Sequence, residues 1–468
     1  MAHVRIFKHY VRTPYLLLGF VEFCVLYASM ILGIHIRFFD QADPLGSLGS
    51  LEVRAGTFAF LMITSMVSMG VYHAKLQEGF SGTLLRTAVS FLLGATALSM
   101  LFYVFPHLYI GRGVVAISAF FAFVAILFVR YAFRRLVDQE SLKRKVVILG
   151  AGKKAQNLID HLGLHFERSI SLVGCISLSD DDNYIDSSKS PVISLNSASL
   201  LSFVEDREID EIVVAIDDRR KTFDFHTLLD CKLRGIDVVD VLTFFEREMG
   251  RVEVEMLHPS WLIFSDGFSS GSFTAFWGRC FDILISGLLL LVSWPIMLAT
   301  LIAIRVEDGF DAPIFYKQER VGLNGKTFFV SKFRSMRIDA EKAGPQWAKE
   351  NDDRVTRVGR FIRKCRIDEL PQIFNVFRGH MAFVGPRPER PQFVSHLEKS
   401  IPFYAERHRV KPGISGWAQL KYPYGSSDKD SLEKLKYDLY YVKNKSLLLD
   451  ILIILQTVEV VLFGKGAR

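Results

Sequence analysis

Cysteine is scarce in this chain, and the few cysteines are scattered. There are 5 in 468 residues, with no CxxC pair and no Cys/His spacing of the kind that binds zinc. A disulfide framework and a zinc site are therefore both disfavoured, and a reducing cytoplasm suits the soluble parts. The cysteines are Cys24, Cys175, Cys231, Cys280 and Cys365.

The excess of basic over acidic residues is also small. Lys+Arg 57 against Asp+Glu 50 gives a net charge of +7, which suits anionic lipid, phosphate ligands or nucleic acid. A charged share of 23% excludes both a disordered chain and a pure membrane bundle. The mean hydropathy of +0.23 is high for a soluble protein, so some apolar residues should face lipid. The length suggests roughly three domains.

A cleaved signal peptide is absent as well, because no small-residue cleavage site follows the first apolar run. Four runs occupy the first third of the chain, and each approaches the roughly 20 residues that cross a bilayer. Buried helices of a soluble core are the alternative. The runs cover residues 15–36, 57–71, 88–105 and 114–133.

The flanking charges predict the orientation of these spans. Basic residues cluster before the first run and after the fourth, whereas the loop after the first run is acidic. By the positive-inside rule, the N-terminus and everything after the fourth span lie in the cytoplasm. The basic residues are Arg5, Lys8, His9 and Arg12, then Arg130, Arg134, Arg135, Lys143, Arg144 and Lys145; the acidic ones are Asp40, Asp43 and Glu52.

Residues 141–265 change to short β-branched runs that alternate with helical stretches. This pattern predicts a doubly wound, Rossmann-like α/β domain. Gly150 and Gly152 follow the first run, where glycines let a strand-to-helix turn approach a pyrophosphate closely. The acidic residue expected at the end of the second strand is absent from residues 172–176. We therefore favour a structural or regulatory domain, with a weak nucleotide loop as the alternative.

A fifth apolar run, residues 283–304, raises the question of which side of the membrane the rest of the chain occupies. A full crossing would place all later residues outside the cell, away from cytoplasmic nucleotides. Ser293 and Pro295 lie at its centre; proline removes a backbone donor, and serine can satisfy the freed carbonyl groups. We therefore expect a re-entrant helix–break–helix hairpin, and a kinked spanning helix is the alternative.

Short basic motifs with glycine and proline beside them occupy residues 315–420. Glycine and proline fix backbone loops around guanidinium groups, so these clusters suggest phosphate ligands. Any single cluster, taken alone, is explained as a solvated basic face. The motifs are KFRSM at 332–336, DELPQ at 368–372, VGPRP at 384–388 and PGISGWAQ at 412–419.

Asp368 and Glu369 are the carboxylate pair to examine. Adjacent helical residues point about 100° apart, so distinct roles are more natural than a paired dyad. Pro371 suits the first turn of a helix, which would place both carboxylates near its N-terminus. Arginines nearby would keep the aspartate ionised and able to attack phosphorus, while the glutamate could hold Mg²⁺. A capping pair with surface salt bridges is the alternative.

These ordered motifs, after an apolar segment broken by S-x-P, resemble the bacterial polyprenyl-phosphate sugar phosphotransferases. These are the monotopic phosphoglycosyl transferases that initiate exopolysaccharide and O-antigen assembly. The resemblance is dense from residue 276 onward, and the preceding spans and Rossmann-like domain look like the long, initiating version. The ending, residues 422–425 and 464–468, looks like the subgroup found with exosortase-linked clusters.

The resemblance implies a two-step reaction. Asp368 would attack the β-phosphate of a UDP-sugar, release UMP and carry a phosphosugar; undecaprenyl phosphate would then accept it. Glu369 would carry Mg²⁺, and Arg387 would grip donor phosphate. Ser293 and Pro295 match the family's helix break. Further phosphate or lipid-headgroup contacts would come from Lys332, Arg334, Arg354 and Arg320.

One position departs from the family pattern. The family usually has G-D-M before V-G-P-R-P, and this chain has Gly379-His380-Met381. Any role of that acid is in doubt here, and we favour a surface position for His380. A membrane-bound nucleotide-sugar oxidoreductase or dehydratase is the alternative function, although its YxxxK string, Tyr441 to Lys445, lies far along the chain from the Gly150 loop.

The fold class expected is a mixed membrane protein of four parts. These are four transmembrane helices in residues 1–140, a Rossmann-like α/β domain in 141–265, a re-entrant helix in 276–310 and a mainly α catalytic domain in 311–468. The expected location is the bacterial inner membrane, with catalysis on the cytoplasmic face. We expect contact with membrane lipid, a homo-oligomer as an option and no nucleic-acid partner. No residue discriminates among sugars.

Overall fold

The computed structural model covers residues 1–468 and describes the placement of most of them. Asp40, Asp43 and residues 464–468, which entered the sequence argument, lie outside the described part. The residues outside it are 1–2, 7–8, 40–50, 73–79, 138–142, 166–169, 178–183, 187–189, 196, 218–224, 258–271, 310–311, 339–352, 423–424, 426 and 463–468.

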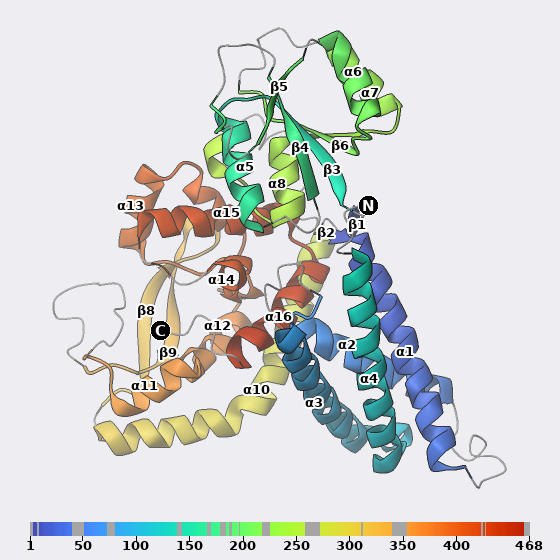
Figure 1. Cartoon of the computed structure of the whole chain (residues 1–468). Coiled ribbons are helices and arrows are strands. Elements are labelled where there is room, and N and C mark those ends of the chain that lie inside the picture. The colour runs from blue at the N-terminus through green and yellow to red at the C-terminus, as the bar shows by residue number, and fades with distance from the viewer. Residues whose placement is uncertain are drawn as a thin grey trace. The chain divides into compact units, whose positions relative to one another are not determined.

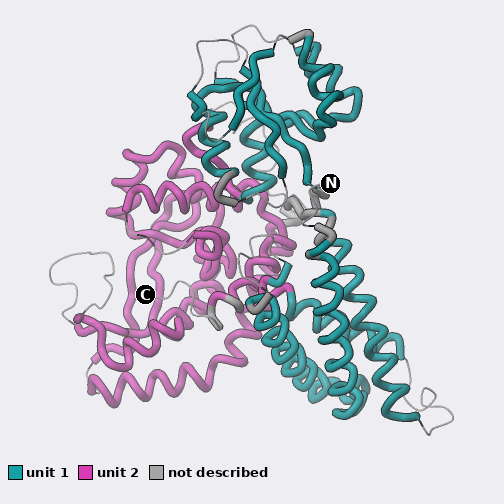
Figure 2. Tube along the Cα trace, in the orientation of Figure 1, with its two compact units in different colours: residues 1–6, 10–66, 71–250 teal, residues 7–9, 67–70, 251–468 magenta. Residues whose placement is uncertain are grey.

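The chain forms two compact units, coloured teal and magenta in Figure 2. The first contains nearly all of residues 1–250, and the second contains residues 251–468 with a few residues from earlier in the chain. Residues 251–257 thus belong to the second unit. The boundary predicted at 265 falls among residues outside the described part, so it stays a prediction.

Long apolar helices form the first part of unit 1 (Figure 1). Each covers or largely overlaps one of the four predicted runs. With α10 of the second unit, five helices among the described residues are long and apolar enough to cross a bilayer. The chain is therefore a membrane protein. The first four are α1 (Thr13–Arg37), α2 (Leu51–Ser68), α3 (Phe80–Val104) and α4 (Arg112–Val137).

Helices α1 and α4 pack along each other and share a buried ion pair. Arg130 Nε donates to Glu22 Oε1 at 2.6 Å, and its Nη2 donates to Oε2 at 2.9 Å. Tyr72 donates its hydroxyl to the same carboxylate and lies under the guanidinium. A bidentate pair offsets the high cost of two charges within an apolar bundle, so it fixes the register of the two helices.

A five-stranded parallel sheet follows, with strand order β5-β4-β3-β6-β7. Helices α5 and α8 lie on one side of it, and α6 and α7 on the other (Figure 1). This arrangement is the Rossmann-like α/β region that the sequence predicts. The strands are β3 (Arg144–Leu149), β4 (Ile170–Ser177), β5 (Val192–Ser194), β6 (Glu211–Val214) and β7 (Asp237–Asp240); the helices are α5 (Lys153–His165), α6 (Ser197–Asp206), α7 (Phe225–Leu233) and α8 (Val241–Met249).

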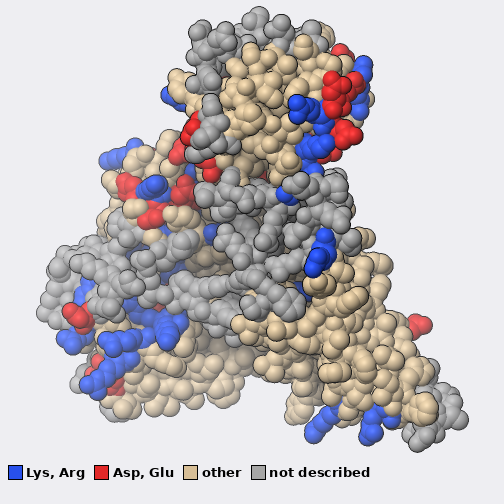
Figure 3. All heavy atoms as spheres, in the orientation of Figure 1, with Lys and Arg blue, Asp and Glu red and all other residues tan. Residues whose placement is uncertain are grey.

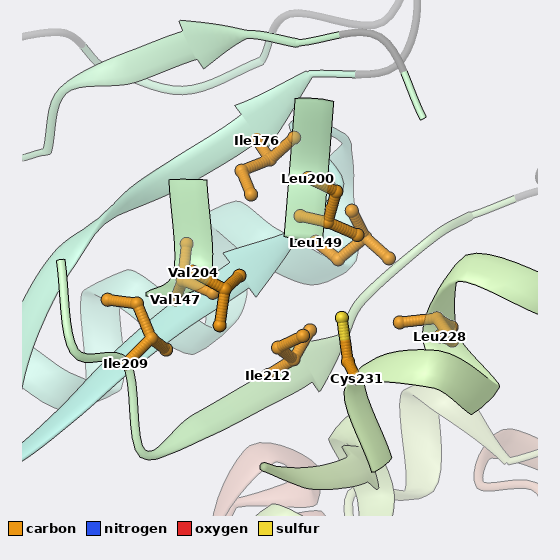
Figure 4. Packing of buried hydrophobic residues seen from close by; sticks show 9 residues of the cluster. All are labelled: Val147, Leu149, Ile176, Leu200, Val204, Ile209, Ile212, Leu228 and Cys231. Atoms are coloured by element: carbon orange, nitrogen blue, oxygen red, sulfur yellow. The ribbon is translucent and has the colours of Figure 1, made fainter. Parts of the chain in front are cut away.

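One face of this sheet packs on α6 and α7 through aliphatic side chains. Val147 and Ile212, on adjacent strands, are fully buried and pack with Leu200 of α6 and Cys231 of α7 (Figure 4). β-branched residues on a doubly covered parallel sheet explain why its strands read as continuous apolar runs. Cys231 is a buried, unbridged thiol that serves here as a small apolar residue.

Helix α10 (Ser272–Asp308) opens the second unit after the segment at 251–257. It is one continuous helix that contains Pro295, and it bends along its length (Figure 1). At 37 residues it is about 55 Å long, well beyond the roughly 30 Å of a hydrocarbon core. Ser293 donates its hydroxyl to Met297 Sδ at 3.9 Å, a contact that differs from the expected bond to a freed carbonyl.

The rest of unit 2 consists of mostly short helices and two small two-stranded sheets. β8 pairs antiparallel with β9, and β10 pairs parallel with β11. The strands are β8 (Phe315–Val321), β9 (Thr327–Phe333), β10 (Ala382–Val384) and β11 (Gly413–Ser415); the helices are α11 (Arg357–Lys364), η6 (Ile367–Gln372), α12 (Ile373–Phe377), α13 (Pro391–Ser400), η7 (Tyr404–Arg409), α14 (Trp417–Lys421), α15 (Asp428–Asn444) and α16 (Leu447–Leu462).

The segment after Gly250 joins unit 2 through buried charges on α15. Lys436 Nζ contacts Glu253 at 2.8 Å and Glu433 at 2.8 Å, and the Val252 amide donates to the Lys436 carbonyl at 2.9 Å. Arg251 adds a pair to Glu253. Because buried charges must be paired, this network specifies where the segment docks on α15.

Candidate active site

Asp368 and Glu369 lie in the first turn of η6, a short 3-10 helix between α11 and α12. Arg366 has a left-handed backbone (φ 55°), which ends α11 and turns the chain into η6. The Asp368 side chain is buried, and 12% of the Glu369 side chain is exposed. Both carboxylates are therefore near a helix start, as the sequence predicts, whereas Pro371 lies one turn later in the same helix than expected.

Two cations from distant parts of the chain meet at Glu369. Lys332 Nζ, from β9, donates to Oε1 at 2.9 Å, and Arg387 Nη2, from the loop after β10, donates to the same oxygen at 2.7 Å. Burial would raise the pKa of Glu369, but the Arg387 and Lys332 charges outweigh it and hold that pKa well below its usual range. Glu369 is therefore a permanent carboxylate at neutral pH.

Asp368 has a different electrostatic environment. Burial raises its pKa to about 6, opposed by the positive charges of Lys332, Arg363 and Arg387 and reinforced by the neighbouring Glu369. The nearby cations alone would lower this pKa, but burial outweighs them. At neutral pH the aspartate is still mostly ionised, and its weak solvation leaves it a better nucleophile.

The loop after β10, residues 385–390, contains Arg387 and is called the arginine loop here. Contacts on both sides hold it. Arg320, from β8, donates to the Pro388 carbonyl at 2.9 Å and contacts Glu389 at 3.4 Å. Tyr441, from α15, donates to the Val384 carbonyl at 3.0 Å. Arg320 therefore helps to position the loop, and its contact with a phosphate or lipid headgroup stays a prediction.

A buried Arg–Asp pair supports the same loop from behind. Arg407 Nη2 donates to the Arg387 carbonyl at 3.0 Å and to Asp438 Oδ2 at 2.7 Å. Its Nη1 donates to the Tyr404 hydroxyl at 2.6 Å. The pair is almost completely buried, with 6% and 2% of the two side chains exposed. Arg407 therefore fixes the main chain of the residue whose side chain contacts Glu369.

The other predicted residues lie as follows. Arg334 pairs with Asp308 at the end of α10, and only 6% of its side chain is exposed, so its charge serves to fix α10. The Arg354 carbonyl accepts from the Arg337 amide at 2.9 Å, next to the Met336–Val355 bridge. His380 is exposed and its ring lies 6.0 Å from that of Phe328, in agreement with the surface position favoured for it.

Sequence reasoning missed two basic contributors to the site. Arg363 influences Asp368 from the last turn of α11, a helix whose Arg357, Arg360 and Lys364 are exposed. Figure 3 shows a blue patch of basic side chains at the lower left, where Figure 1 places α11. The dense basic run at 357–366 was a usable signal for Arg363. Arg407 lies in a similar run at 407–411, but its burial had no local signal.

Asp368 and Glu369 could hold Mg²⁺ only together with a phosphate ligand. The described residues contain no group of three or more His, Cys, Asp or Glu side chains placed to hold a metal ion. Mg²⁺, however, is commonly held by one or two carboxylates together with substrate phosphates. Asp368 and Glu369 are oxygen donors of that kind, so they fit Mg²⁺ that arrives with a phosphate ligand.

Two family models match parts of this chain. A family model described as bacterial sugar transferase matches residues 273–464, and one described as CoA-binding domain matches residues 67–222. The first match contains Asp368, Glu369, Lys332 and Arg387. The second spans the end of α2, all of α3 and α4, and four of the five strands of the parallel sheet.

Three relatives illustrate the likeness. An Aeromonas hydrophila UDP-N-acetylgalactosamine-undecaprenyl-phosphate N-acetylgalactosaminephosphotransferase is 43% identical over 52% of this chain and 56% of its own length. A Komagataeibacter xylinus undecaprenyl-phosphate glucose phosphotransferase is 33% identical over 74% of this chain and 65% of its own length. An uncharacterised sugar transferase of Bacillus subtilis is 40% identical over 41% of this chain and 89% of its own length.

Coverage differs among these relatives. The chain spans about half to two thirds of the length of the first two, at 56% and 65%, but nearly all of the shorter B. subtilis protein, at 89%. The chain therefore belongs to the bacterial sugar transferases, the family of the polyprenyl-phosphate sugar phosphotransferases that its motifs resemble.

Proposed function

We propose that this protein transfers a sugar 1-phosphate from a UDP-sugar to undecaprenyl phosphate and releases UMP. The observation that carries the proposal is the meeting of Lys332 and Arg387 at Glu369, beside the buried Asp368. Two carboxylates with different pKa values can take different roles, one of them as a nucleophile. The cations around them suit a bound phosphate. The names of the A. hydrophila and K. xylinus relatives state the same class of reaction.

In the first step, an Asp368 carboxylate oxygen attacks the β-phosphorus of the donor. The bond between that phosphorus and the oxygen bridging to the α-phosphate breaks, and UMP leaves with the bond's electron pair. In the second step, a phosphate oxygen of undecaprenyl phosphate attacks the same phosphorus and releases the Asp368 carboxylate. The products are undecaprenyl-diphosphate-sugar and the original enzyme, so two easier displacements replace one difficult one.

The remaining residues bind and orient the reactants. Arg387 and Lys332 already hold one oxygen of Glu369, and a donor diphosphate would share their positive charges. Glu369, with its low pKa, stays anionic and would hold Mg²⁺ together with Asp368. When bound, Mg²⁺ neutralises the charge that develops on the phosphate oxygens. The exposed basic side chains of α11 suit a lipid phosphate.

A panel of UDP-sugars tests the reaction directly. We expect the purified full chain, given undecaprenyl phosphate and Mg²⁺, to release UMP with at least one of UDP-glucose, UDP-galactose and their N-acetylated forms. Coupled detection of UMP, with omission of the lipid as a control, measures turnover. No UMP release with any of these donors would contradict the proposed function.

The proposal requires α10 to enter and leave on one side of the membrane. At its start, Arg279 donates to the Val376 carbonyl at 2.6 Å and Asp282 accepts from the Phe383 amide at 2.8 Å. At its end, Glu307 accepts from the Arg357 amide at 2.8 Å and Asp308 pairs with Arg334. Both ends therefore contact the same compact unit, which favours re-entry over a full crossing. The middle of the helix, which contains Pro295, would lie in the membrane.

Cysteine labelling checks this topology. In a background without native cysteines, we expect single cysteines near Arg279 and near Arg305 to react with an impermeant maleimide only from the cytoplasmic side. The charged ends of a re-entrant helix lie on one aqueous face, which is the physical reason. A cysteine placed at Lys399, which is exposed on α13 of the same unit, serves as the reference. Labelling of the two helix ends from opposite sides would contradict re-entry.

We further propose a location in the bacterial inner membrane, with catalysis on the cytoplasmic face, and a role at the start of exopolysaccharide synthesis. The five apolar helices support a membrane location. The cytoplasmic face follows from the need for a UDP-sugar and from the basic flanks of α1 and α4. A homo-oligomer is compatible with this function but is not required by it.

A further inference from the structure

The start of α5 is where a Rossmann-like domain would receive a pyrophosphate. The amides at the beginning of that helix carry its partial positive charge, and a glycine-rich turn precedes it. A match to a CoA-binding family over residues 67–222 implies a ligand with such a group, because CoA contains a pyrophosphate. Whether the domain takes that ligand depends on what these amides already bind.

A carboxylate of the chain itself occupies these donors. Asp217 Oδ2 accepts from the Lys153 amide at 2.7 Å, and Oδ1 accepts from the Lys154 amide at 3.1 Å. Lys154 also reaches back, with its Nζ donating to the Ile216 carbonyl at 3.1 Å. Two oxygens on two successive amides at a helix start reproduce the way in which a phosphate would be held.

Both glycines of the turn are explained by this contact. A Cβ at Gly152 would lie 2.2 Å from Asp217 Oδ2, so any larger residue would displace the carboxylate. A Cβ at Gly150 would lie 2.7 Å from the Ala215 carbonyl oxygen, and its φ of +122° also favours glycine. The glycines therefore admit the chain segment after β6, in the place where they would otherwise admit a cofactor.

Tyr184 also contacts the turn. The Tyr184 amide donates to the Ala151 carbonyl at 2.9 Å, and the Lys153 ammonium lies 5.5 Å from the centre of the Tyr184 ring.

We infer that Asp217 permanently takes the pyrophosphate's place at the start of α5, and that the α/β domain does not bind CoA or a dinucleotide. The domain is then a self-contained module whose glycine loop is closed by its own carboxylate. This inference does not depend on the proposed transfer reaction. It disfavours the alternative of a nucleotide-sugar oxidoreductase, since that chemistry needs a dinucleotide on this loop.

Titration of the full chain tests the inference. We expect CoA and NAD⁺, each added to about 1 mM, to give no binding heat assignable to the α/β domain. Hydrogen exchange followed by mass spectrometry locates any binding, because a ligand on the loop would change protection in the peptide containing Lys153 and Lys154. Binding of either compound with altered exchange in residues 144–250 would overturn the inference.

Substitution of Asp217 tests the contact itself. In Asp217→Ala, amide exchange at residues 153–154 should rise about fivefold, as expected when a helix cap is lost. Asp217→Asn keeps an oxygen acceptor and should fold, with a smaller rise. Glu205→Ala, which removes an exposed carboxylate from α6, is the matched control and should leave this peptide unchanged. Exchange that stays at the wild-type rate in both Asp217 variants would refute the contact.

Discussion

Asp368→Asn is expected to reduce UMP release by at least about a thousandfold with every UDP-sugar, because the amide cannot form the phosphosugar intermediate. The change preserves size and one oxygen acceptor, so the buried position should be kept. The measurement is UMP formation by purified protein with donor and undecaprenyl phosphate. Glu398→Gln, which alters an exposed carboxylate of α13, is the matched control and should retain wild-type turnover.

Mass spectrometry separates a nucleophile from a residue that only orients the donor. Wild-type protein incubated with the preferred donor and no lipid acceptor should carry a sugar-phosphate adduct on the peptide containing Asp368. The adduct should be absent from the Asn variant and should disappear from wild type when undecaprenyl phosphate is added. Substantial turnover by Asp368→Asn, or an adduct on a different residue, would reject the assignment.

The same variant should be more stable than wild type at neutral pH. The pKa of Asp368 in the folded state, about 6, lies above the ordinary value of about 3.9. Between these values the folded state binds more protons than the unfolded state, so the free energy of unfolding falls as pH rises through this window. Asparagine does not ionise and avoids this loss.

The Tm difference between the variant and wild type should therefore be small at pH 4, grow up to pH 6 and stay constant above it. A difference of one in pKa corresponds to about 1.4 kcal/mol, so an effect on the order of a few kcal/mol is expected. Thermal unfolding in detergent at a series of pH values measures it. A lower Tm of the variant at pH 7.5 would mean that the ionised carboxylate is stabilised by its neighbours.

Much of the architecture followed from the spacing of apolar residues. The length of the apolar runs predicted the long helices, and alternating β-branched runs predicted the parallel sheet. Single-residue detail was harder, because it depends on contacts between distant segments. Asp217 lies 65 residues after Gly152, and no local pattern marks it as the occupant of that loop. The glycines indicated a close approach correctly, but not what approaches.

In the candidate site, too, the local motif was predictable and the contacts between distant segments were not. The DELPQ motif was enough to single out Asp368 and Glu369 and to place them at the start of a short helix. The partners of Glu369 come from 37 residues before it and 18 residues after it, and only the folded chain brings them together. Arg334, two residues from Lys332, pairs with Asp308 instead. A motif identifies which cations are near, whereas strand register and helix packing decide which one reaches the carboxylate.

The buried Arg407–Asp438 pair should support both stability and activity, and substitutions should separate these two effects. Asp438→Leu leaves the Arg407 charge buried without its carboxylate, so we expect the free energy of unfolding to fall by about 3–5 kcal/mol. The double variant Arg407→Met/Asp438→Leu replaces the pair by apolar side chains and should recover most of that loss. Denaturant unfolding of both variants measures the difference.

Activity should not recover with stability, because the hydrogen bond from Arg407 to the Arg387 carbonyl is absent from the double variant. We expect its kcat to remain at least about tenfold low, since a loosened loop misplaces the Arg387 guanidinium. The exposed Arg409–Glu406 pair on η7 provides the control: Arg409→Met/Glu406→Leu should change stability by less than about 1 kcal/mol and leave kcat unchanged. Full activity in the stable Arg407→Met/Asp438→Leu variant would show that Arg407 serves packing alone. The arginine loop would then be supported by Arg320 and Tyr441.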